Sequence, residues 1–404
     1  MLIMSCIKNI SKCPRILFLN QMAGPLFREL AEDISGKWPS GELFTGHPDT
    51  IKAEQKEFLK ITTAPTYERG NYILRLWSWF RYLFLAFFRY LFLNKNTFVF
   101  LVPFPPFLDF IACFFKRLRG QRYAVLVYDI YPDALINFGP LKESGLIAKI
   151  WRGTNRVSWQ NAEVVFTIGY KMAENLERMF DSSKTSAGKV ITIPNWANTD
   201  WIRPLAKKEN RFAQKYKQVG KLTVMYSGNL GQTHDIETIL ETAKELKENG
   251  SIKFMIIGDG AKKGLVEQAK YKENLHNLTV LDFQPEEILP YSLATADIAI
   301  ITIDNGLEGV SVPSKTYYSM ASGAALIALC NENSEVAQTI KKHNCGFIIT
   351  PGNTNAMIKA ILELLGDKEK LKCYKNNSRN AAENFYSRKN TKQYIDVIAS
   401  FLNI

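Results

Sequence analysis

The sequence predicts an α/β protein made of two domains, each built on a doubly wound parallel sheet. Three observations lead to this fold class. Short runs of aliphatic and β-branched residues recur along the chain, the intervals between them are long enough for helices, and 404 residues suffice for two hydrophobic cores. The runs are apolar almost throughout, which is typical of parallel strands buried on both faces of a sheet.

The apolar runs fall into two sets. Those expected as strands are 15–20, 98–103, 123–129, 164–169 and 190–195 in the first half, and 221–228, 253–260, 278–283, 298–303 and 325–330 in the second. Residues 203–221, between the sets, are charged and poor in large aliphatic side chains, and we interpret them as a surface connector. The sequence therefore predicts a first domain over 1–203 and a second over 204–387. Ligands of such sheets bind beyond the carboxyl ends of strands, so we expect the site in the cleft between the domains.

The charge of the chain is concentrated in one region. There are 51 Lys and Arg residues against 39 Asp and Glu, a net charge of +12. Between 66 and 125, basic residues stand at 69, 75, 81, 89, 95, 116, 117, 119 and 122, and acidic residues only at 68 and 109. Such a patch suits nucleic acid or an anionic membrane surface. Because no RNA- or DNA-binding motif accompanies it, we predict no nucleic-acid partner.

The six cysteines and the N-terminal stretch bear on metal binding and export. The cysteines show no CxxC pairing, so we expect reduced thiols and no bound metal. Lysines interrupt the first apolar stretch, and no small-residue cleavage site follows it. We therefore predict no secretory signal.

Residues 73–92 predict an amphipathic helix. At 100° per residue, Arg75, Ser78, Arg81 and Arg89 fall within about 120° of one another, and the aromatic residues lie largely elsewhere. The longest uncharged run, 82–88, is too short to span a bilayer. The pattern favours a helix lying in a membrane interface, helped by a second apolar stretch with a basic end at 105–120. The alternative is that both helices pack in the core of the first domain. The candidate membrane-contacting residues are Arg75, Trp77, Trp79, Phe80, Arg81 and Arg89.

Two strand ends in the second half are rich in glycine. Gly228 and Gly231 flank a tight turn in YSGNLGQTHD, and Gly258 and Gly260 close IGDG. Glycines at such positions let the backbone approach a ligand, and a following helix N-terminus favours an anion. The alternative is that they form purely structural turns.

The segment EGVSVPSKTYYSMASG, 308–323, is the strongest candidate site. We expect Pro313 in the first turn of a helix capped by Ser311 or Ser314, so that backbone amides, a hydroxyl and Lys315 converge where a diphosphate could bind. Glu308 lies upstream, where a carboxylate could accept hydrogen bonds from sugar hydroxyls. The alternative is a solvated loop before a capped helix.

These motifs resemble retaining glycosyltransferase family 4, which has the GT-B fold. The resemblance rests on IPNWANTDWIRPL, YSGNLGQTHDIETIL, FMIIGDG, ATADIAIITI, EGVSVPSKTYYSMASGAALIA and NCGFIITPGNTNAM, in the family's order. Within this family, the sequence is most similar to bacterial enzymes of O-antigen and capsule synthesis. The resemblance implies a nucleotide-sugar donor on the second domain, an acceptor on the first, retention of configuration without a required metal or other cofactor, and a final helical segment, 388–404, that packs back on the first domain.

The chain also departs from the family pattern. The second glutamate that usually contacts the ribose falls on Thr316, or on Tyr318 when counted back from MASG. The usual Arg and Lys after the glycine turn fall on Asn229 and His234, which makes Lys315 the nearest replacement for their charge. In the first domain, a position often held by histidine is Tyr128, followed by Asp129.

Each candidate residue takes a role from these arguments. Glu308, Asp129 and Lys315 are assigned to the sugar, the acceptor hydroxyl and the diphosphate respectively. The donor-binding candidates are Gly228, Asn229, His234, Gly258, Gly260, Phe283, Gln284, Gly309, Val310, Ser311, Ser314, Lys315 and Tyr318. The acceptor-side candidates are Gln21, Gly24, Tyr128 and Asp129.

The expected activity is transfer of a sugar from a UDP-N-acetylhexosamine, or a related UDP-amino sugar, to a polyprenyl-diphosphate-linked saccharide. We expect it at the inner face of the cytoplasmic membrane, during surface polysaccharide assembly. One alternative is a nucleotide-sugar 2-epimerase of the same architecture. The other is a non-catalytic partner subunit that binds nucleotide sugar or membrane.

Overall fold

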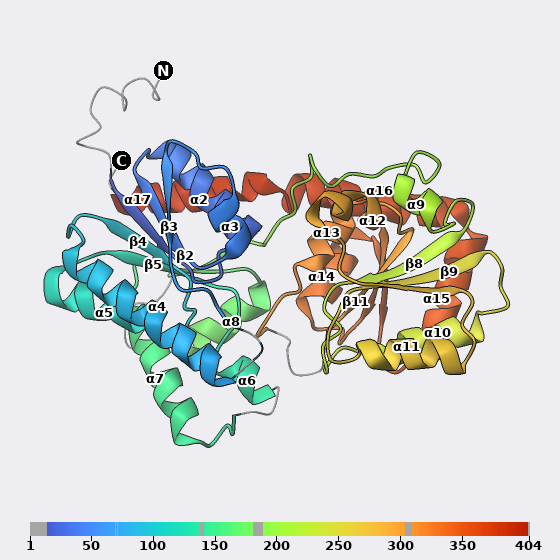
Figure 1. The fold of residues 1–404 in the computed structure, drawn as a ribbon, viewed down its shortest axis with the longest axis horizontal. Helices are drawn as coiled ribbons and strands as arrows, with labels where there is room; N and C mark the ends of the chain where they lie inside the picture. Colours follow the sequence, from blue (N-terminus) through green and yellow to red (C-terminus); the bar gives the residue numbers. More distant parts are fainter. Residues whose placement is uncertain are drawn as a thin grey trace. The chain divides into compact units, whose positions relative to one another are not determined.

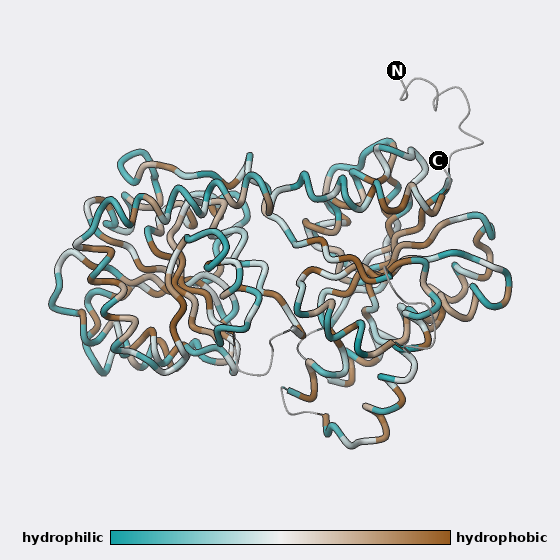
Figure 2. The backbone as a smooth tube through the Cα atoms, turned by 180° about the vertical axis from the view of Figure 1, so that it is seen from behind, coloured by the Kyte–Doolittle hydropathy of each residue, from teal (hydrophilic) through white to brown (hydrophobic). Residues whose placement is uncertain are grey.

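The computed structural model describes residues 14–68, 70, 72–137, 141–180, 189–303 and 309–402. The chain divides into two compact units: unit 1 comprises Met1–Pro194 and Lys389–Ile404, and unit 2 comprises Asn195–Arg388. Each unit contains one parallel sheet with helices on both faces (Figure 1). The most hydrophobic residues lie in the strands at the centre of each unit (Figure 2).

Unit 1 contains a seven-stranded sheet in the order β3-β2-β1-β4-β5-β6-β7. The strands are β1 (Ile16–Leu19), β2 (Gly41–Thr45), β3 (Leu59–Thr63), β4 (Phe98–Leu101), β5 (Tyr123–Val127), β6 (Val164–Thr167) and β7 (Val190–Thr192). The helices are α2 (Pro25–Lys37), α3 (Pro48–Lys52), α4 (Tyr72–Phe92), α5 (Leu108–Arg119), α6 (Asp133–Asn137), α7 (Leu146–Asn161), α8 (Tyr170–Met179) and α17 (Thr391–Leu402).

The last helix, α17, completes the core of unit 1. Its Tyr394 is fully buried and lies 4.7 Å, between ring centres, from Phe166 of β6. Thr391 donates a hydrogen bond of 2.8 Å to Asp33 of α2. In Figure 1, α2 and α17 cover one face of this sheet, and α4, α5 and α7 cover the other.

Unit 2 contains a six-stranded sheet in the order β10-β9-β8-β11-β12-β13. The strands are β8 (Leu222–Ser227), β9 (Ile252–Ile257), β10 (Leu278–Leu281), β11 (Ile298–Thr302), β12 (Ala325–Leu329) and β13 (Gly346–Ile349). The helices are α9 (Arg211–Lys215), α10 (Glu237–Glu245), α11 (Lys263–Lys272), α12 (Leu289–Leu293), α13 (Lys315–Ala321), α14 (Glu335–His343), α15 (Thr354–Gly366) and α16 (Lys368–Phe385), with 3₁₀ turns η2 (Glu286–Ile288) and η3 (Arg388–Asn390).

The predicted strands are all present, and the doubly wound parallel fold class is confirmed. Three strands were missed: β2, β3 and β13. Two of them, β3 and β13, are edge strands that are only partly buried. Polar residues interrupt LKITT, and GFII is apolar but short, so neither resembles the longer apolar run of a central strand. The third, GELFT, is interrupted by a glutamate.

The boundary between the units differs from the prediction. We expected the first domain to end at residue 203, but the compact units divide after Pro194. Residues after Pro194 belong to unit 2 because they bond to its last long helix: Arg379 of α16 donates to the carbonyls of Thr199 and Ile202, at 2.9 and 2.8 Å.

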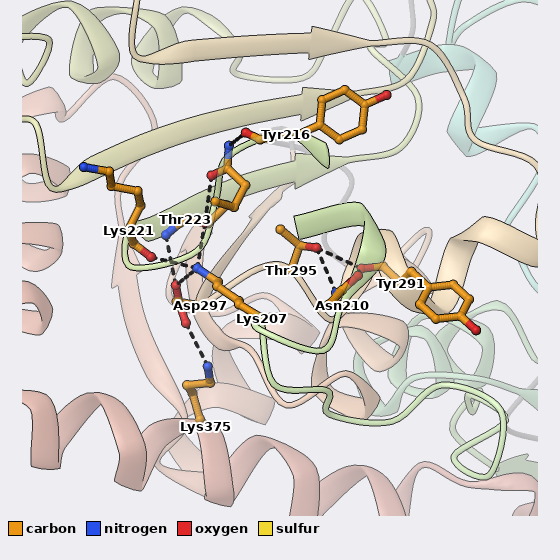
Figure 3. Close-up of polar contacts among 10 residues, drawn as sticks. Lys207, Asn210, Tyr216, Lys221, Thr223, Tyr291, Thr295, Asp297 and Lys375 are labelled. Carbon is orange, nitrogen blue, oxygen red and sulfur yellow. Dashed lines mark hydrogen bonds and ion pairs between the residues drawn. The ribbon is translucent and has the colours of Figure 1, made fainter. Parts of the chain in front are cut away.

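The interpretation of 203–221 as a surface connector is wrong. Figure 3 shows Lys207 and Asn210 of this segment bonded into unit 2. Asn210 is fully buried, caps α9 with its side-chain oxygen and donates to Tyr291 O at 2.8 Å. Phe212 and Gln218 are also buried. The segment is rich in charged residues, and its sequence therefore did not reveal that a few buried side chains pack it into unit 2.

Asp297 holds the start of β11, β8, the 203–221 segment and α16 together. Its carboxylate accepts from Thr223 N at 3.0 Å and from Lys375 Nζ at 2.9 Å, and it pairs with Lys207. Burial acts to raise the pKa of Asp297, but the charges of Lys375 and Lys207 outweigh it and hold the pKa below the ordinary value of 3.8. This stabilisation is therefore complete above that pH and is lost as the pH falls through the folded-state pKa.

Replacing Asp297 with Asn tests this anchor. The lysines at 207 and 375 would lose their counter-charge, and we expect the free energy of unfolding of unit 2 to fall by about 2–3 kcal/mol. Urea unfolding at pH 7 measures the loss. Glu363→Gln, which breaks the exposed ion pair with Lys370, is the matched control and should change stability by less than about 1 kcal/mol. Equal effects of the two variants would contradict the anchoring role.

Candidate functional site

The candidate site lies in unit 2 where the strand order reverses. From β8 the chain moves outward through β9 and β10, and it then returns to form β11 on the other side of β8. Loops that follow β8 and β11 leave toward opposite faces, which opens a crevice at the carboxyl ends of these strands. A cavity of about 340 Å³ lies here, lined by Gly228, Asn229, His234, Thr302, Ile303, Ser311, Pro313, Ser314 and Lys315.

The lining brings together two motifs that are far apart in sequence. Gly228, Asn229 and His234 come from the glycine turn after β8, and Ser311, Ser314 and Lys315 come from the loop that leads to α13. Six of the residues that the sequence assigned to the donor therefore lie around one cavity. Convergence of a lysine, a histidine and two hydroxyls favours an anionic, hydrogen-bonding ligand.

Gly258 and Gly260 lie where two backbone turns come close together. A Cβ on Gly258 would lie 1.9 Å from the carbonyl oxygen of Gly228, and one on Gly260 would lie 2.6 Å from that of Leu230. Both glycines have positive φ, and neither lines the cavity. They therefore allow two backbone turns to pack together.

The helix after the cavity starts later than expected. α13 begins at Lys315, so Pro313 precedes the helix, and Ser314 at the N-cap makes no side-chain capping bond. Ser314 is exposed at the cavity instead. The hydroxyl that we expected to cap the helix is thus available to a ligand.

Tyr226 was missed by the sequence analysis. It is fully buried in β8, and its hydroxyl accepts a hydrogen bond of 3.0 Å from Lys315 Nζ and lies 2.8 Å from His234 Nδ1. In the sequence it belongs to an apolar strand, so only the fold reveals that its hydroxyl points toward the cavity-lining side chains.

Thr302 and Ile303 were also missed, although the strand end that contains them was predicted. Thr302 is 2% exposed, and its hydroxyl has no hydrogen-bond partner in the part of the chain that the structure describes. A buried hydroxyl of this kind is costly unless it is satisfied by water or by a ligand. Its place in the cavity lining supports a polar ligand there.

Other donor-side candidates lie outside the cavity lining. Phe283 is 57% exposed in the loop after β10, and Gln284 donates to Asp282 O at 2.8 Å in the same loop. Gly309 and Val310 are buried in the turn before Ser311. Thr316 is buried, whereas Tyr318 is partly exposed, which favours Tyr318 of the two candidates for the ribose. Glu308 lies outside the described residues.

The acceptor-side candidates lie in unit 1. Gln21 is fully buried, and its amide donates to Pro65 O at 3.0 Å and to Ser78 O at 3.2 Å. Gly24 precedes α2 beside His47. Tyr128 and Asp129 follow β5 and are partly exposed. Burial, reinforced by the charge of Asp129, raises the pKa of the nearby Tyr131.

α4 is amphipathic, but its arginines do not form its solvent-exposed face. The helix packs on unit 1 through Ser78, Tyr82, Ala86 and Tyr90, one residue per turn. Arg89 lies on this side, where it pairs with Glu42 and stacks 5.0 Å from the ring centre of Phe44. Among the predicted membrane-contacting residues, Arg75 and Trp79 are partly buried, and Trp77, Phe80 and Arg81 are exposed.

The exposed face of α4 is instead aromatic. Trp77, Phe80, Phe84 and Phe88 form a ladder along it, with successive ring centres 5.6, 6.1 and 4.8 Å apart. Neighbouring helices add exposed apolar side chains: Phe110, Phe114 and Leu118 of α5, and Leu146, Ile147 and Ile150 of α7. The alternative that α4 and α5 are ordinary core helices does not account for this surface.

None of the described helices is long and apolar enough to cross a membrane. The described part of the chain also holds no cluster of three or more His, Cys, Asp or Glu side chains able to bind a metal ion.

The second half of the chain is similar to known glycosyltransferases. Residues 207–381 match the family described as glycosyl transferases group 1. The protein "Probable glycosyltransferase WbjE" of Pseudomonas aeruginosa is 26% identical over 245 residues, 61% of this chain and 60% of its own length. WcaI of Escherichia coli K12, provisionally named a colanic acid biosynthesis glycosyl transferase, is 23% identical over 254 residues, 62% of this chain and 61% of its own. The chain thus spans about 60% of the length of these relatives.

Solved structures confirm the fold. The Anabaena protein Alr3699/HepE, solved in complex with UDP, covers 96% of this chain and 100% of its own at 12% identity, with a TM-score of 0.71. WaaG, a glycosyltransferase involved in lipopolysaccharide biosynthesis, covers 95% and 99% at 12% identity, with a TM-score of 0.70. The predicted GT-B fold of two Rossmann-like domains is therefore confirmed. Residues 207–381, within unit 2, are thus similar to the family described as glycosyl transferases group 1.

Proposed function

We propose that this protein is a retaining glycosyltransferase of surface polysaccharide biosynthesis that takes a sugar from a UDP-sugar. The observation that carries the proposal is the cavity at the β8–β11 reversal, with Lys315, His234, Ser314 and the buried hydroxyl of Thr302 in its lining. Support for UDP comes from the Anabaena structure of the same fold, which was solved with that nucleotide. An N-acetylhexosamine or a related amino sugar is the proposed transferred group.

The catalytic roles follow from charge and position. Lys315 and the Ser314 hydroxyl stabilise the diphosphate as its bond to the sugar breaks, because negative charge grows there in the transition state. Glu308 binds the sugar hydroxyls. Asp129 of unit 1 orients the acceptor hydroxyl or takes its proton. No metal is assigned to these steps.

The proposed acceptor is a saccharide linked to polyprenyl diphosphate, reached at the inner face of the cytoplasmic membrane. The aromatic face of α4 supports membrane contact, because exposed aromatic side chains insert into the interfacial region of a bilayer. A groove of about 640 Å³ between 63–68 and α4 includes Leu74, Trp77 and Leu85, together with Arg81. Apolar side chains beside an exposed arginine suit a lipid chain with an anionic head, and Glu68 in the same lining offsets part of the positive charge.

Turnover with defined substrates tests the proposal. The purified chain is mixed with UDP-N-acetylglucosamine or another UDP-amino sugar and with a short polyprenyl-diphosphate saccharide in anionic detergent micelles. We expect a lengthened lipid-linked saccharide whose new linkage keeps the anomeric configuration of the donor, read by NMR. An inverted linkage would reject the retaining mechanism, and an epimerised free donor would favour the 2-epimerase alternative.

Lys315→Ala should weaken UDP binding. Loss of a hydrogen bond to a charged group amounts to about 1.5–3 kcal/mol, so we expect the Kd for UDP, measured by calorimetry, to rise roughly 10- to 150-fold. Binding of uridine, which has no phosphate, should not change. Lys272→Ala, on an exposed position of α11, is the matched control. An unchanged Kd for UDP in Lys315→Ala would remove this lysine from the site.

Glu308→Gln should separate binding from chemistry. The amide keeps the size of the side chain but loses the charge that the proposal assigns to the transferred sugar, so kcat should fall while the Kd for free UDP stays unchanged. Parallel losses in kcat and in UDP affinity would mean that Glu308 shapes the nucleotide site instead.

Removing the aromatic ladder should release the protein from membranes. Trp77, Phe80 and Phe84 are each at least 52% exposed, so replacing all three with Ser should not disturb the core of unit 1. Each side chain loses apolar burial in the lipid, and we expect affinity for anionic vesicles to fall by more than about tenfold in a sedimentation assay. Serines at the exposed Tyr271, Leu362 and Phe385 of unit 2 provide the control. Equal vesicle binding by both triple variants would argue against the α4 face as the membrane contact.

A further inference from the structure

Tyr226 links the two basic side chains of the cavity to the backbone of the glycine turn. Lys315 Nζ donates to the tyrosine oxygen at 3.0 Å, His234 Nδ1 lies 2.8 Å from it, and the carbonyl oxygen of Asn229 lies 2.6 Å from it. The Lys315 ammonium also lies 4.3 Å from the centre of the tyrosine ring. One buried side chain therefore touches the cation, the imidazole and the turn.

The hydrogen-bonding capacity of a phenol matches these contacts. A tyrosine hydroxyl donates one hydrogen and accepts through two lone pairs. The Asn229 carbonyl can only accept, so it takes the hydrogen, and the Lys315 ammonium can only donate, so it uses one lone pair. The second lone pair is left for His234 when Nδ1 carries a proton. The Asn229 carbonyl lies 2.8 Å from the same Nδ1, which favours a proton on Nδ1, while the Gly231 amide is more distant at 3.3 Å. With Nδ1 engaged in this way, the ring donates to an anion through Nε2 in the imidazolium form, in which both nitrogens carry hydrogens.

The surroundings hold Tyr226 and His234 firmly. Tyr226 has no solvent exposure and is part of β8, which is paired with β9 on one side and β11 on the other. The backbone carbonyl of His234 accepts a hydrogen bond of 2.7 Å from Lys262, and Lys262 is paired with Glu237 at 2.8 Å. Lysine side chains are long and flexible, so a fixed acceptor reduces the entropy lost when Lys315 meets an anion.

We propose that Tyr226 is the positioning residue of a diphosphate-binding pair formed by Lys315 and His234. The choice of a nucleoside diphosphate as the ligand rests on the proposed function, and the inference adds how this chain holds it. The pair stands in for the Arg and Lys that the sequence lacks after the glycine turn. Tyr226 acts through the two basic residues and does not itself touch the ligand.

Tyr226→Phe removes only the hydroxyl and keeps the buried ring. We expect its Kd for UDP to rise roughly tenfold, because Lys315 loses its fixed acceptor. The Kd for uridine should be unchanged. Tyr374→Phe, at another buried tyrosine of unit 2 that does not line the cavity, is the matched control and should bind UDP like the wild type.

A double-mutant cycle separates positioning from a general structural effect. If Tyr226 acts through Lys315, the hydroxyl deletion should change UDP affinity much less in the Lys315→Ala background than in the wild type. Equal effects in both backgrounds, or a wild-type Kd for UDP in Tyr226→Phe, would overturn the positioning role and leave the proposed function standing.

Inorganic pyrophosphate distinguishes failure of the inference from failure of the proposed function. The wild-type protein could bind pyrophosphate but no nucleotide, and Tyr226→Phe could bind pyrophosphate more weakly than the wild type. That result would support the diphosphate-binding pair and reject the UDP-sugar donor. A wild-type protein that binds neither UDP nor pyrophosphate would overturn both.

Discussion

The pairing of β8 with β11 is the constraint on which the rest of unit 2 depends. The two strands run parallel, with Ile298 beside Val224 and Ala299 beside Met225. At their amino ends, Asp297 accepts from Thr223 N through its carboxylate and donates from its backbone N–H to Thr223 O, both at 3.0 Å. At their carboxyl ends the chain departs in opposite directions, and the cavity lies between the two departures. The same strand pair therefore carries a charged anchor at one end and the candidate site at the other.

The carboxyl end needs close backbone packing as well as the reversal. The turn after β8 and the turn after β9 exchange hydrogen bonds, from Gly228 N to Ile257 O at 2.9 Å and from Leu230 N to Asp259 O at 2.8 Å. This approach leaves no room for a Cβ at Gly258. These bonds restrict the backbone of the glycine turn. Asn229 and His234 therefore line the cavity from a segment with little conformational freedom. A rigid support of this kind favours binding, since less ordering is required when a ligand arrives.

Unit 1 has a different constraint in α4. The helix packs through Ser78, Tyr82, Ala86 and Tyr90 and leaves its aromatic ladder outside. On the inner side, Gln21 bonds to Ser78 O and Glu42 pairs with Arg89. Exposed aromatic surface of this extent is unfavourable in water, and the membrane contact that we propose would offset this cost. The charges that would attract an anionic surface are the exposed Arg81 and Arg117. Periodicity predicted the helix correctly, but it could not decide which face packs, since the partner of Arg89 is a partly buried glutamate 47 residues away in the chain.

The sequence predicted the parts of the fold that rest on local pattern. Continuous apolar runs such as 98–101 and 325–329 predicted their strands directly. The turn glycines and Lys315 predicted the position of the cavity. Contacts between distant residues could not be predicted: the hydroxyl of Tyr226 lies inside an apolar strand, and Lys207 sits in a segment whose charge resembles that of a solvated loop.

The central claim is that the cavity at the β8–β11 reversal binds a nucleoside diphosphate. A thermal-shift comparison of UDP, GDP, ADP, CMP and dTDP at millimolar concentration tests it most directly, because a ligand that binds only the folded state must raise the melting temperature. The account predicts that UDP raises it and that the other nucleotides do not. A melting temperature that no nucleotide changes would contradict the account and favour a non-catalytic role for this chain.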